Sequence, residues 1–408
     1  MRQAVWLVAL AAFAQDPAGT LERAREKILP RLTRLPKMIC VETIDRRYFP
    51  RENQAGPAPA CETIGLDRKR GRNAPRLGYT DRVRVAVTIV DGREIYSWTG
   101  AEPPSYSVED ILHPGPIGTG AFAGHLLDIF VNPAVQFRLL EEGSETLEYG
   151  FRVPIEGSRY SVRAGGEWVT TGYSGSFRIE RGSQNIDRFT VQTNELPPET
   201  SLCETASILE FSAGTDWLVP KTGTTHDVMR DASETDSTTT IADCREATAP
   251  MPERQPTAGP ALPPNILLSL AFNTPFDSDL TAAGDAISAT IAEAHPEGSK
   301  DAKLAWLAGA TVKGRITRVE HRQRSFLFSV AWETFEVNGV RSPFYAKLIH
   351  NAPFALVPVP EKSTFPPPSG HGRKDWSATF VFDSRASRYV LRAPFESKWL
   401  TTAADAAN

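Results

Sequence analysis

Serine, histidine and aspartate residues that could support hydrolysis occur in several places, so nucleophilic catalysis is the first chemistry to consider. The stretch from Gly172 to Glu199, GYSGSFRIERGSQNIDRFTVQTNELPPE, is rich in serine and glycine. A hydrolase nucleophile elbow requires the order Gly-x-Ser-x-Gly, but here the second glycine follows Ser174 directly. Serine is also common in turns, where its hydroxyl bonds to the nearby backbone. We therefore predict two strands joined by a turn, with no catalytic residue.

Seven histidines are spread along the chain without the spacing that metal binding or acid–base chemistry favours. The zinc motif His-Glu-x-x-His is absent. His125 and Asp128 lie three residues apart on an expected helix, where such neighbours usually form a surface pair. His226 and Asp227 are adjacent, so on a strand their side chains point to opposite faces. We predict no catalytic residue and no metal site, and we keep a hydrolase whose site is dispersed in the sequence as the alternative.

Two further segments resemble ligand-binding loops in composition alone. Residues 118–124, GTGAFAG, lack the Lys-Ser/Thr pair of a P-loop and the glycine spacing of a dinucleotide loop. Asp277, Asp279 and Asp285 lie in FDSDLTAAGD, which lacks the glycine and the terminal glutamate of a calcium loop at the required spacing. The aspartate segment predicts a turn, and we expect no cofactor.

Composition and charge indicate a globular chain rather than a nucleic-acid-binding one. Charged residues make up 23% and hydrophobic residues 41% of the 408 residues, and the net charge is −4. The locally basic run from Asp67 to Arg76 has no interleaved aromatic residues, so we expect a solvated loop there. We therefore predict no nucleic-acid partner.

The first residues have the layout of a secretory signal peptide. Arg2 precedes an apolar run, and Ala12-Phe13-Ala14 gives the small-x-small pattern of a cleavage site. A buried N-terminal helix is the alternative. No later stretch approaches about 18 consecutive apolar residues, so we expect no transmembrane span. We predict export to the periplasm or the extracellular space.

Four cysteines, Cys40, Cys61, Cys203 and Cys244, are an even number in a chain expected to be exported, which indicates disulfides. Four cysteines allow three connectivities, and the sequence does not choose among them. We favour the sequential pairs, Cys40–Cys61 and Cys203–Cys244, because each would close a local excursion of the chain. No pair has C-x-x-C spacing, which argues against a metal site.

Proline-rich segments divide the chain. We predict a signal peptide (1–14), a curved antiparallel sheet or half-barrel domain (15–248), a linker (249–262), a small β-module (263–356), a proline-rich segment (357–375), and a C-terminal strand pair with a tail (376–408).

Periodicity places helices and strands within this division. Apolar residues at helical spacing predict a helix over 20–35, with Thr20 as its N-cap and a kink or early end at Pro30. A second short helix is expected over 121–131, because Phe122, Leu126 and Ile129 lie at helical spacing. Evenly spaced strands with one apolar face follow from Phe137. The predicted fold class is mainly β (α+β): a curved antiparallel sheet with one or two helices, plus a second small all-β domain.

Several segments together resemble a known family. LPKMICVETIDRRYF, GAFAGHLLDIF, GYSGSFRIERGSQNIDRFTV and ILEFSAGTDWLVPKTGTTHDV occur in the order seen in uncharacterised exported bacterial proteins, and the strand arrangement is similar to the LolA/LolB-like half-barrel of lipoprotein carriers. The resemblance covers roughly residues 20–248 and implies a curved sheet that wraps helices around an apolar cavity. Residues 262–350 resemble small β-modules of envelope and secretion-associated proteins.

The resemblance implies a non-enzymatic envelope protein. Its expected ligand is a lipid or lipoprotein acyl chain, or a protein partner, bound on the curved sheet. Period-2 alternation predicts which side chains share one face of each strand. The predicted ligand-binding residues are Val85, Val87, Tyr149, Phe151, Phe177 and Phe189.

Overall fold

The computed structural model describes most of the chain outside the expected signal peptide and the proline-rich segments. The described residues are 16–33, 37–51, 56–71, 75–90, 93–100, 124–164, 167–193, 196–197, 199–211, 218–247, 259–299, 302–350, 379–383 and 388–403. The predicted signal peptide, most of the linker and the segment 357–375 lie outside them. Strands dominate the described residues, which confirms the predicted mainly β class.

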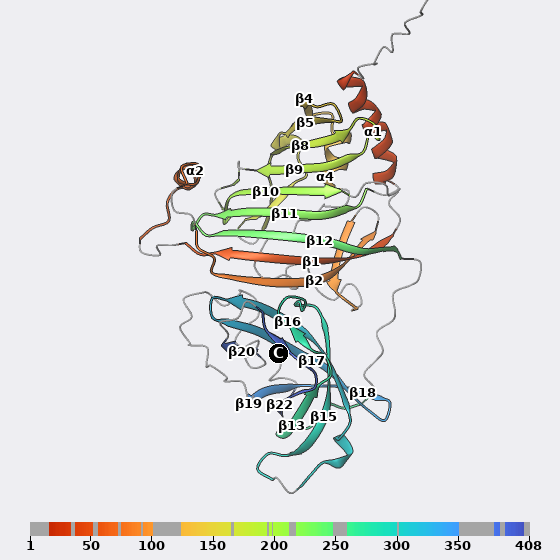
Figure 1. Ribbon diagram of the computed structural model, residues 1–408, viewed down its shortest axis with the longest axis vertical. Helices are drawn as coiled ribbons and strands as arrows, with labels where there is room; N and C mark the ends of the chain where they lie inside the picture. Colours follow the sequence, from red (N-terminus) through yellow and green to blue (C-terminus); the bar gives the residue numbers. More distant parts are fainter. Residues whose placement is uncertain are drawn as a thin grey trace, which may run out of the picture.

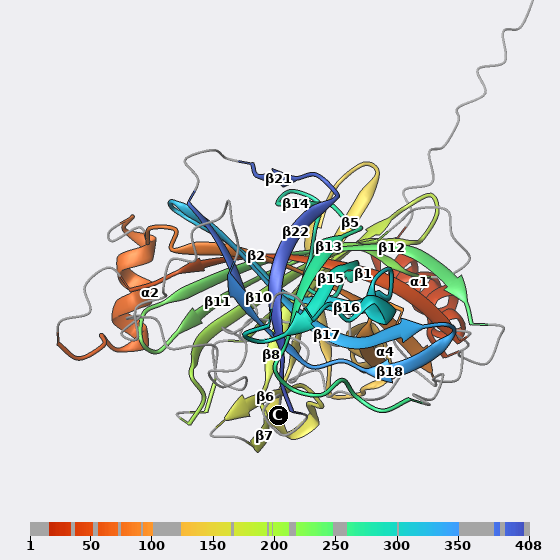
Figure 2. The ribbon, with the colours of Figure 1, turned by 90° about the horizontal axis from the view of Figure 1, so that it is seen from below.

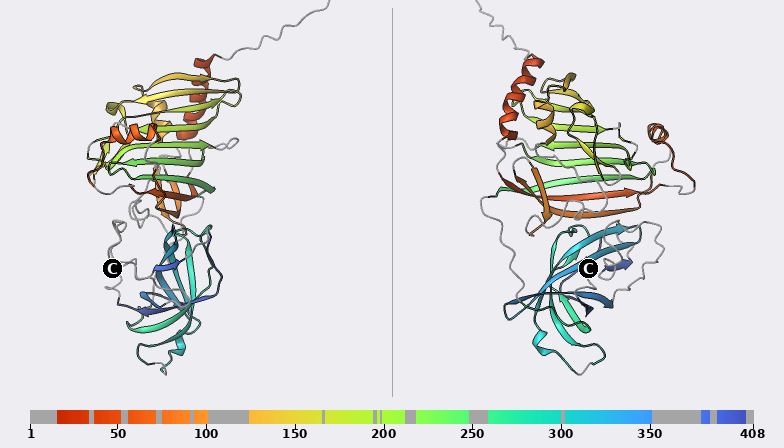
Figure 3. Two further views of the ribbon diagram at one scale, coloured as in Figure 1. Left: turned by 60° about the vertical axis from the view of Figure 1, so that its left-hand side comes forward. Right: turned by 180° about the vertical axis from the view of Figure 1, so that it is seen from behind.

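The first unit is one large curved antiparallel sheet that does not close into a barrel (Figures 1 and 3). Its strands follow the chain as a meander for most of their order, but β1 and β2 lie beyond β12. Across the sheet the strands are β4 (Gln136–Glu142), β5 (Thr146–Val153), β8 (Tyr173–Glu180), β9 (Ile186–Thr193), β10 (Leu202–Phe211), β11 (Pro220–Met229), β12 (Glu234–Glu246), β1 (Met38–Phe49), β2 (Tyr79–Val90) and β3 (Arg93–Trp98).

Alternation of burial along the strands explains why this sheet has one apolar face. In β1 every second residue from Met38 to Arg46 is buried, as the pleat of a half-covered strand requires. The serine-rich stretch forms β8 and β9, as predicted. Ser183 lies in the connecting turn, where its hydroxyl donates to Glu180 (2.6 Å) and accepts from the Asn185 amide (3.1 Å). Ser183 therefore belongs to the turn, whereas the Ser176 hydroxyl in β8 donates to Glu148 (2.7 Å).

Among the described residues the first unit has three helices: α1 (Pro17–Thr33), α2 (Cys61–Lys69) and α4 (Gly124–Val131). The predicted N-cap at Thr20 is wrong, since α1 begins earlier. Asp16 caps it instead, accepting from the amides of Ala18 (3.3 Å) and Gly19 (3.2 Å), and Pro17 occupies the first helical position, where its missing N–H costs nothing. Part of the basic run predicted as a loop is helical, because α2 extends to Lys69.

The second unit is a smaller all-β body that the C-terminal strands complete. β22 pairs with β13 and β19, and β20 pairs with β17, so the final segment shares the sheet of the preceding module. Its core contains the buried rings of Phe272, Phe328 and Trp399. Its strands are β13 (Ile266–Phe272), β15 (Ala286–Pro296), β16 (Thr311–Arg322), β17 (Ser325–Val337), β18 (Val340–Pro343), β19 (Ala346–His350), β20 (Thr379–Asp383) and β22 (Phe395–Thr401).

Shorter elements complete the two units. A positive φ at both Asn338 (50°) and Gly339 (78°) forms the tight turn between β17 and β18 that the Asn-Gly pair predicts. Figure 2 shows two small ladders outside the main sheet. They are β6 (Ser161–Ala164) with β7 (Glu167–Thr170), and β14 (Phe276–Asp277) with β21 (Val390–Leu391); single 3₁₀ turns are η1 (Ile155–Gly157) and η2 (Ala305–Leu307).

The two units meet along one edge of the first sheet, which we call the junction (Figure 1). The first residues of β2 pair with the last residues of β16, so that Asp81 lies opposite Glu320 and Tyr79 opposite Arg322. The turn at Gly284 also lies against β2, because the Arg84 amide donates to the Ala283 carbonyl (2.7 Å). Backbone hydrogen bonds therefore hold the second unit directly against the first.

The predicted disulfide pairing is wrong. Cys40 bonds to Cys244 across the neighbouring strands β1 and β12, and Cys61 at the start of α2 bonds to Cys203 in β10. The sequential pairs fail because β1 leaves its sequence neighbours and enters the sheet beside β12. Strand order rather than sequence separation therefore decides which cysteines meet.

Candidate functional site

The candidate site is the inner face of the first sheet, meaning the face turned toward α1 and α4. The six predicted ligand-binding residues all lie there and belong to one hydrophobic cluster, with exposures of 0% to 4%. Phe151 stacks on Phe189 with ring centroids 5.4 Å apart, and Tyr149 stacks on Phe177 at 5.7 Å. Val85 and Val87 lie on β2, toward the other end of the same face.

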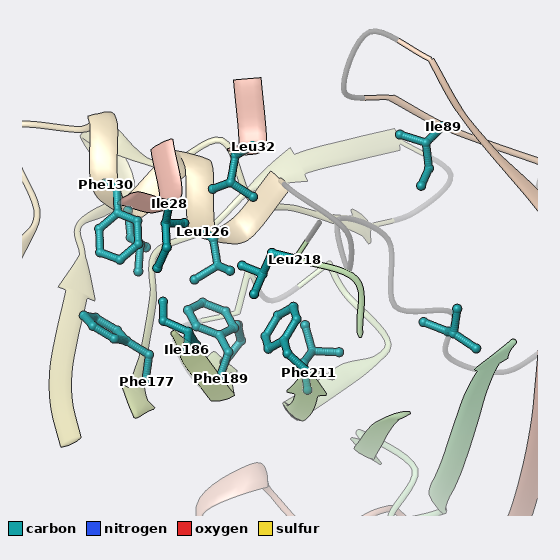
Figure 4. Close-up of a cluster of buried hydrophobic side chains, with 14 of the residues drawn as sticks. Ile28, Leu32, Ile89, Leu126, Phe130, Phe177, Ile186, Phe189, Phe211 and Leu218 are labelled. Carbon is teal, nitrogen blue, oxygen red and sulfur yellow. The ribbon is translucent and has the colours of Figure 1, made fainter. Parts of the chain in front are cut away.

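Two helices cover the aromatic part of the inner face around Phe177 and Phe189, and we call them the cover. Figure 4 shows Ile28 and Leu32 of α1 and Leu126 and Phe130 of α4 packed against the sheet side chains. The Phe130 ring meets Phe177 edge to face at 5.4 Å. The structure thus places the six predicted residues in a closed apolar core. Whether they contact a ligand stays a prediction.

A few polar contacts hold the cover to the sheet. On α1, the Pro17 carbonyl accepts from the Tyr149 hydroxyl (2.6 Å) and the Lys27 ammonium donates to the Ser183 carbonyl. On α4, Asp128 accepts from the Tyr173 hydroxyl (3.2 Å). Burial is the main reason that the pKa of Tyr173 is raised, and the neighbouring Asp128 raises it further. Each contact joins side chain to helix at a single point, so apolar packing supplies most of the attachment.

Neither disulfide touches the cover. One joins two strands of the sheet and the other ties α2 to β10. β1 and β12 are therefore joined covalently, as are α2 and β10, whereas α1 and α4 are held by noncovalent contacts among the described residues. A rearrangement of the cover would break no covalent bond.

Sequence reasoning missed a carboxylic acid on the inner face. Glu42 on β1 lies opposite Val85 on β2 and is only 2% exposed. Burial raises its pKa to about 8, and the nearby Glu94 raises it as well. The carboxyl is therefore mostly protonated at neutral pH, which lowers the cost of placing it among apolar groups. The sequence pattern that could have identified Glu42 is the alternation of β1, which places it on the same face as Cys40 and Ile44.

The cover also contributes side chains that were not predicted. Phe130 is fully buried against the aromatic face, although only Phe122, Leu126 and Ile129 define the expected helical stripe. Its position four residues after Leu126 is the signal that could have found it.

The histidine pairs considered for catalysis serve structural contacts. His226 Nδ1 lies 2.6 Å from Asp236, and its Nε2 lies 2.6 Å from a nitrogen of Arg68 on α2. Both ring nitrogens thus face charged groups and neither faces a serine. Asp227 is buried on the opposite face of β11, as alternation predicts, and burial raises its pKa to about 6. His226 therefore belongs to an ion network beneath α2.

The remaining candidates are likewise separated or already paired. His125 packs its ring near Phe189, whereas Asp128 bonds to Tyr173. Asp277 and Asp279 contact Arg388, and Asp285 pairs with Arg84 (2.5 Å). Across the part of the chain that the structure describes, no three His, Cys, Asp or Glu side chains converge as metal ligands. None of its helices is long and apolar enough to cross a membrane.

Comparisons with known proteins give one structural likeness. The crystal structure of a LolA superfamily protein from Nitrosomonas europaea matches at 12% identity, covering 57% of this chain and 94% of the other, with a TM-score of 0.24. No protein-family model matches the chain, and no curated protein matches it. The function proposed below rests on the geometry of the inner face.

Proposed function

We propose that this chain is an extracytoplasmic, non-enzymatic binding protein whose inner face holds an apolar chain, such as a lipid or lipoprotein acyl group. The observation that carries the proposal is a difference in attachment: disulfides join parts of the sheet and α2, but none joins α1 or α4. One disulfide joins β1 to β12 and the other ties α2 to β10, but the aromatic part of the inner face is covered by two helices that no disulfide retains. A cover of this kind can give way to a ligand while the sheet keeps its shape.

The free energy lost when Ile28 and Leu32 leave the inner face is similar in size to the free energy gained when an acyl chain is buried there. Burying an isoleucine or leucine side chain stabilises by about 1.5–3 kcal/mol, so Ile28 and Leu32 together contribute about 3–6 kcal/mol. An alkyl chain gains about 0.8 kcal/mol for each buried methylene, so about four to eight methylenes match the contribution of these two side chains. An acyl chain of ordinary length can therefore offset the loss of their contacts.

Export belongs to the same proposal. Two disulfides are typical of proteins that fold outside the reducing cytosol. We retain residues 1–14 as the proposed signal peptide and residue 15 as the proposed start of the mature chain. N-terminal sequencing of the protein from the native envelope fraction tests this part, and an intact Met1 on cytoplasmic protein would contradict it.

The binding proposal is tested by loosening the cover. The double substitution Ile28→Ala and Leu32→Ala should raise the apparent affinity for a fluorescent fatty acid several-fold, because a larger fraction of molecules presents an open face. The matched control is Ile291→Ala, which removes an equally buried side chain from the core of the second unit. It should lower stability and leave fatty-acid binding unchanged.

Two results would count against the proposal. One is that neither the double variant nor the Ile291→Ala control binds the fluorescent fatty acid at a probe concentration of about 1–10 μM. The other is an equal rise in binding for the Ile291→Ala control, which would show that general unfolding exposes the probe site. Native mass spectrometry of protein from its own envelope adds an independent readout, since a bound lipid shifts the mass of the intact protein.

A further inference from the structure

The carboxyl of Glu42 is a buried polar group on the inner face that the proposed function does not yet use. Glu42 alternates with Cys40 and Ile44 along β1, so its side chain points to the same face as the hydrophobic cluster, and it is only 2% exposed. No described residue donates a hydrogen bond to this carboxyl, and no described arginine or lysine pairs with it. A buried polar group without a partner is costly, so a ligand atom that bonds to it gains affinity.

A second carboxyl lies on the same face, close to Glu42. Glu42 lies opposite Val85 on β2, and Val85 lies opposite Trp98 on β3. Glu94 and Tyr96 alternate with Trp98 along β3, which brings both to the inner face. The Tyr96 hydroxyl donates to Glu94 Oε2 (3.0 Å) and so fixes this carboxyl beside the inner face. The charge of Glu94 acts on Glu42, so this end of the face favours a positive group.

A row of cross-strand neighbours joins Glu42 to the aromatic part of the inner face. Phe189 on β9 lies opposite Leu209 on β10, and the pairing continues through β11 and β12 to Ile44 on β1. These three side chains belong to one hydrophobic cluster. Four strand spacings separate β9 from β1, about 19 Å. One acyl layer fills about half of the roughly 30 Å hydrocarbon core of a bilayer, so an acyl chain with its polar end at Glu42 spans most of this row.

We infer that the ligand of the inner face is a long-chain amphiphile whose polar end is a protonated amine, and that Glu42 binds this ammonium while Glu94 adds negative charge beside it. The inference rests on the proposed function, because the apolar chain lies along the row toward Phe189. An ammonium has three donors and forms charge-assisted hydrogen bonds with carboxylates. A carboxylate at the same place would meet Glu94 with like charge. The amine belongs either to a free amphiphile or to a lipid headgroup.

The test compares ligands that share one chain length and differ in their polar end. Dodecylamine, dodecanol and laurate compete with an uncharged fluorescent probe for the wild type, Glu42→Gln and Asp227→Asn. Glutamine keeps the shape of Glu42 but cannot carry its negative charge. Asp227 is also a buried inner-face carboxyl, and its β12 partner Thr235 is six residues from Ile241, the partner of Glu42, a separation of about 20 Å. Asp227→Asn is therefore the matched control.

Dodecylamine should bind the wild type and Asp227→Asn about tenfold or more tighter than dodecanol, as expected for a charge-assisted hydrogen bond at a buried site. Glu42→Gln should lose this preference and keep its affinity for dodecanol. Lauroyl lysophosphatidylethanolamine and lauroyl lysophosphatidylglycerol, which differ in the amine, identify the source. Tighter binding of the former indicates a lipid headgroup, and binding of dodecylamine alone indicates a free amphiphile; both support the inference.

The pH profile gives a readout that a purely structural role of Glu42 would not change. Burial, and then Glu94, raise the pKa of Glu42 to about 8, while burial raises the pKa of Tyr96 well above its ordinary value. The carboxylate that pairs with an ammonium therefore forms as the pH rises, and the affinity for dodecylamine should increase between about pH 6 and pH 8. Glu42→Gln should show no such increase.

The inference is overturned if dodecylamine binds no tighter than dodecanol, or if Glu42→Gln keeps the preference and its pH dependence. In both cases binding of dodecanol would leave the proposed function standing, whereas absence of binding for all of these amphiphiles would overturn both. If Glu42→Gln does not fold, Glu94→Gln should weaken the preference for dodecylamine instead, and an unchanged preference in that variant would overturn the inference.

Discussion

Replacing Gly284 with alanine should loosen the junction. Gly284 has a φ of +104°, and a Cβ added there would lie 2.0 Å from the Arg84 carbonyl oxygen. Because that oxygen belongs to β2 backbone, it cannot rotate away. The turn must then shift from β2, which disturbs the bond from the Arg84 amide to Ala283 (2.7 Å) and the bond from Arg315 to the Gly284 carbonyl (2.6 Å).

The expected size of the effect follows from these contacts. Holding a non-glycine residue at such a φ costs about 1–3 kcal/mol. Each hydrogen bond contributes about 1 kcal/mol, and a buried donor left without a partner costs about 1–3 kcal/mol. We expect Gly284→Ala to lower the free energy of unfolding of the junction by about 3–6 kcal/mol in total.

A matched control variant separates the cost of the positive φ from the cost of the overlap between the added Cβ and β2. Gly298 also has a positive φ (+81°), but nothing lies within 4 Å of its added Cβ. Gly298→Ala should therefore show the strain alone. Native-state hydrogen exchange is the assay, because the amides of Ala283 and Arg84 donate across the junction and report its opening directly.

The reasoning would be refuted if these amides stayed as protected in Gly284→Ala as in the wild type. Equal loss of stability in Gly284→Ala and Gly298→Ala would also refute it, since the effect would then come from φ strain without the close approach. Selective exposure of the junction amides, with the core of each unit still protected, is the expected outcome.

Two further predictions concern the inner face and its cover. Glu42 has a folded-state pKa of about 8, above its ordinary value of 4.5, so the folded protein binds a proton that the unfolded chain releases between these pH values. Stability should therefore fall as pH rises from 4.5 to 8, by at most about 1.4 kcal/mol per pH unit. Glu42→Gln should flatten this fall in denaturation midpoints measured from pH 5 to pH 8, and an unchanged slope would exclude Glu42 as its cause. Asp16→Ala removes the cap of α1 and should destabilise that helix by about 1 kcal/mol; faster hydrogen exchange confined to α1 is expected, and unchanged exchange there would contradict the capping role.

The sequence by itself determined the local elements of this protein. Alternating apolar residues place Val85 and Val87 on one face of β2 whatever lies beside that strand, because successive side chains point to opposite faces. The Asn338-Gly339 pair sets its turn through the positive φ that both residues tolerate. The serines of β8 and β9 belong to strands and a turn for the same local reason. These features depend on neighbours within a few residues, so a sequence pattern can report them.

The tertiary structure alone decided which distant elements meet. Cys40 finds Cys244 because β1 inserts beside β12, and no local pattern encodes that choice. The packing of α1 and α4 on the inner face is likewise a tertiary choice, because the apolar stripe of each helix could pack against many surfaces. Glu320 lies beside Asp81 only because β2 and β16 pair at the junction. Long-range pairing reflects the total burial and hydrogen bonding of the whole chain, so it cannot be read from the spacing of residues along it.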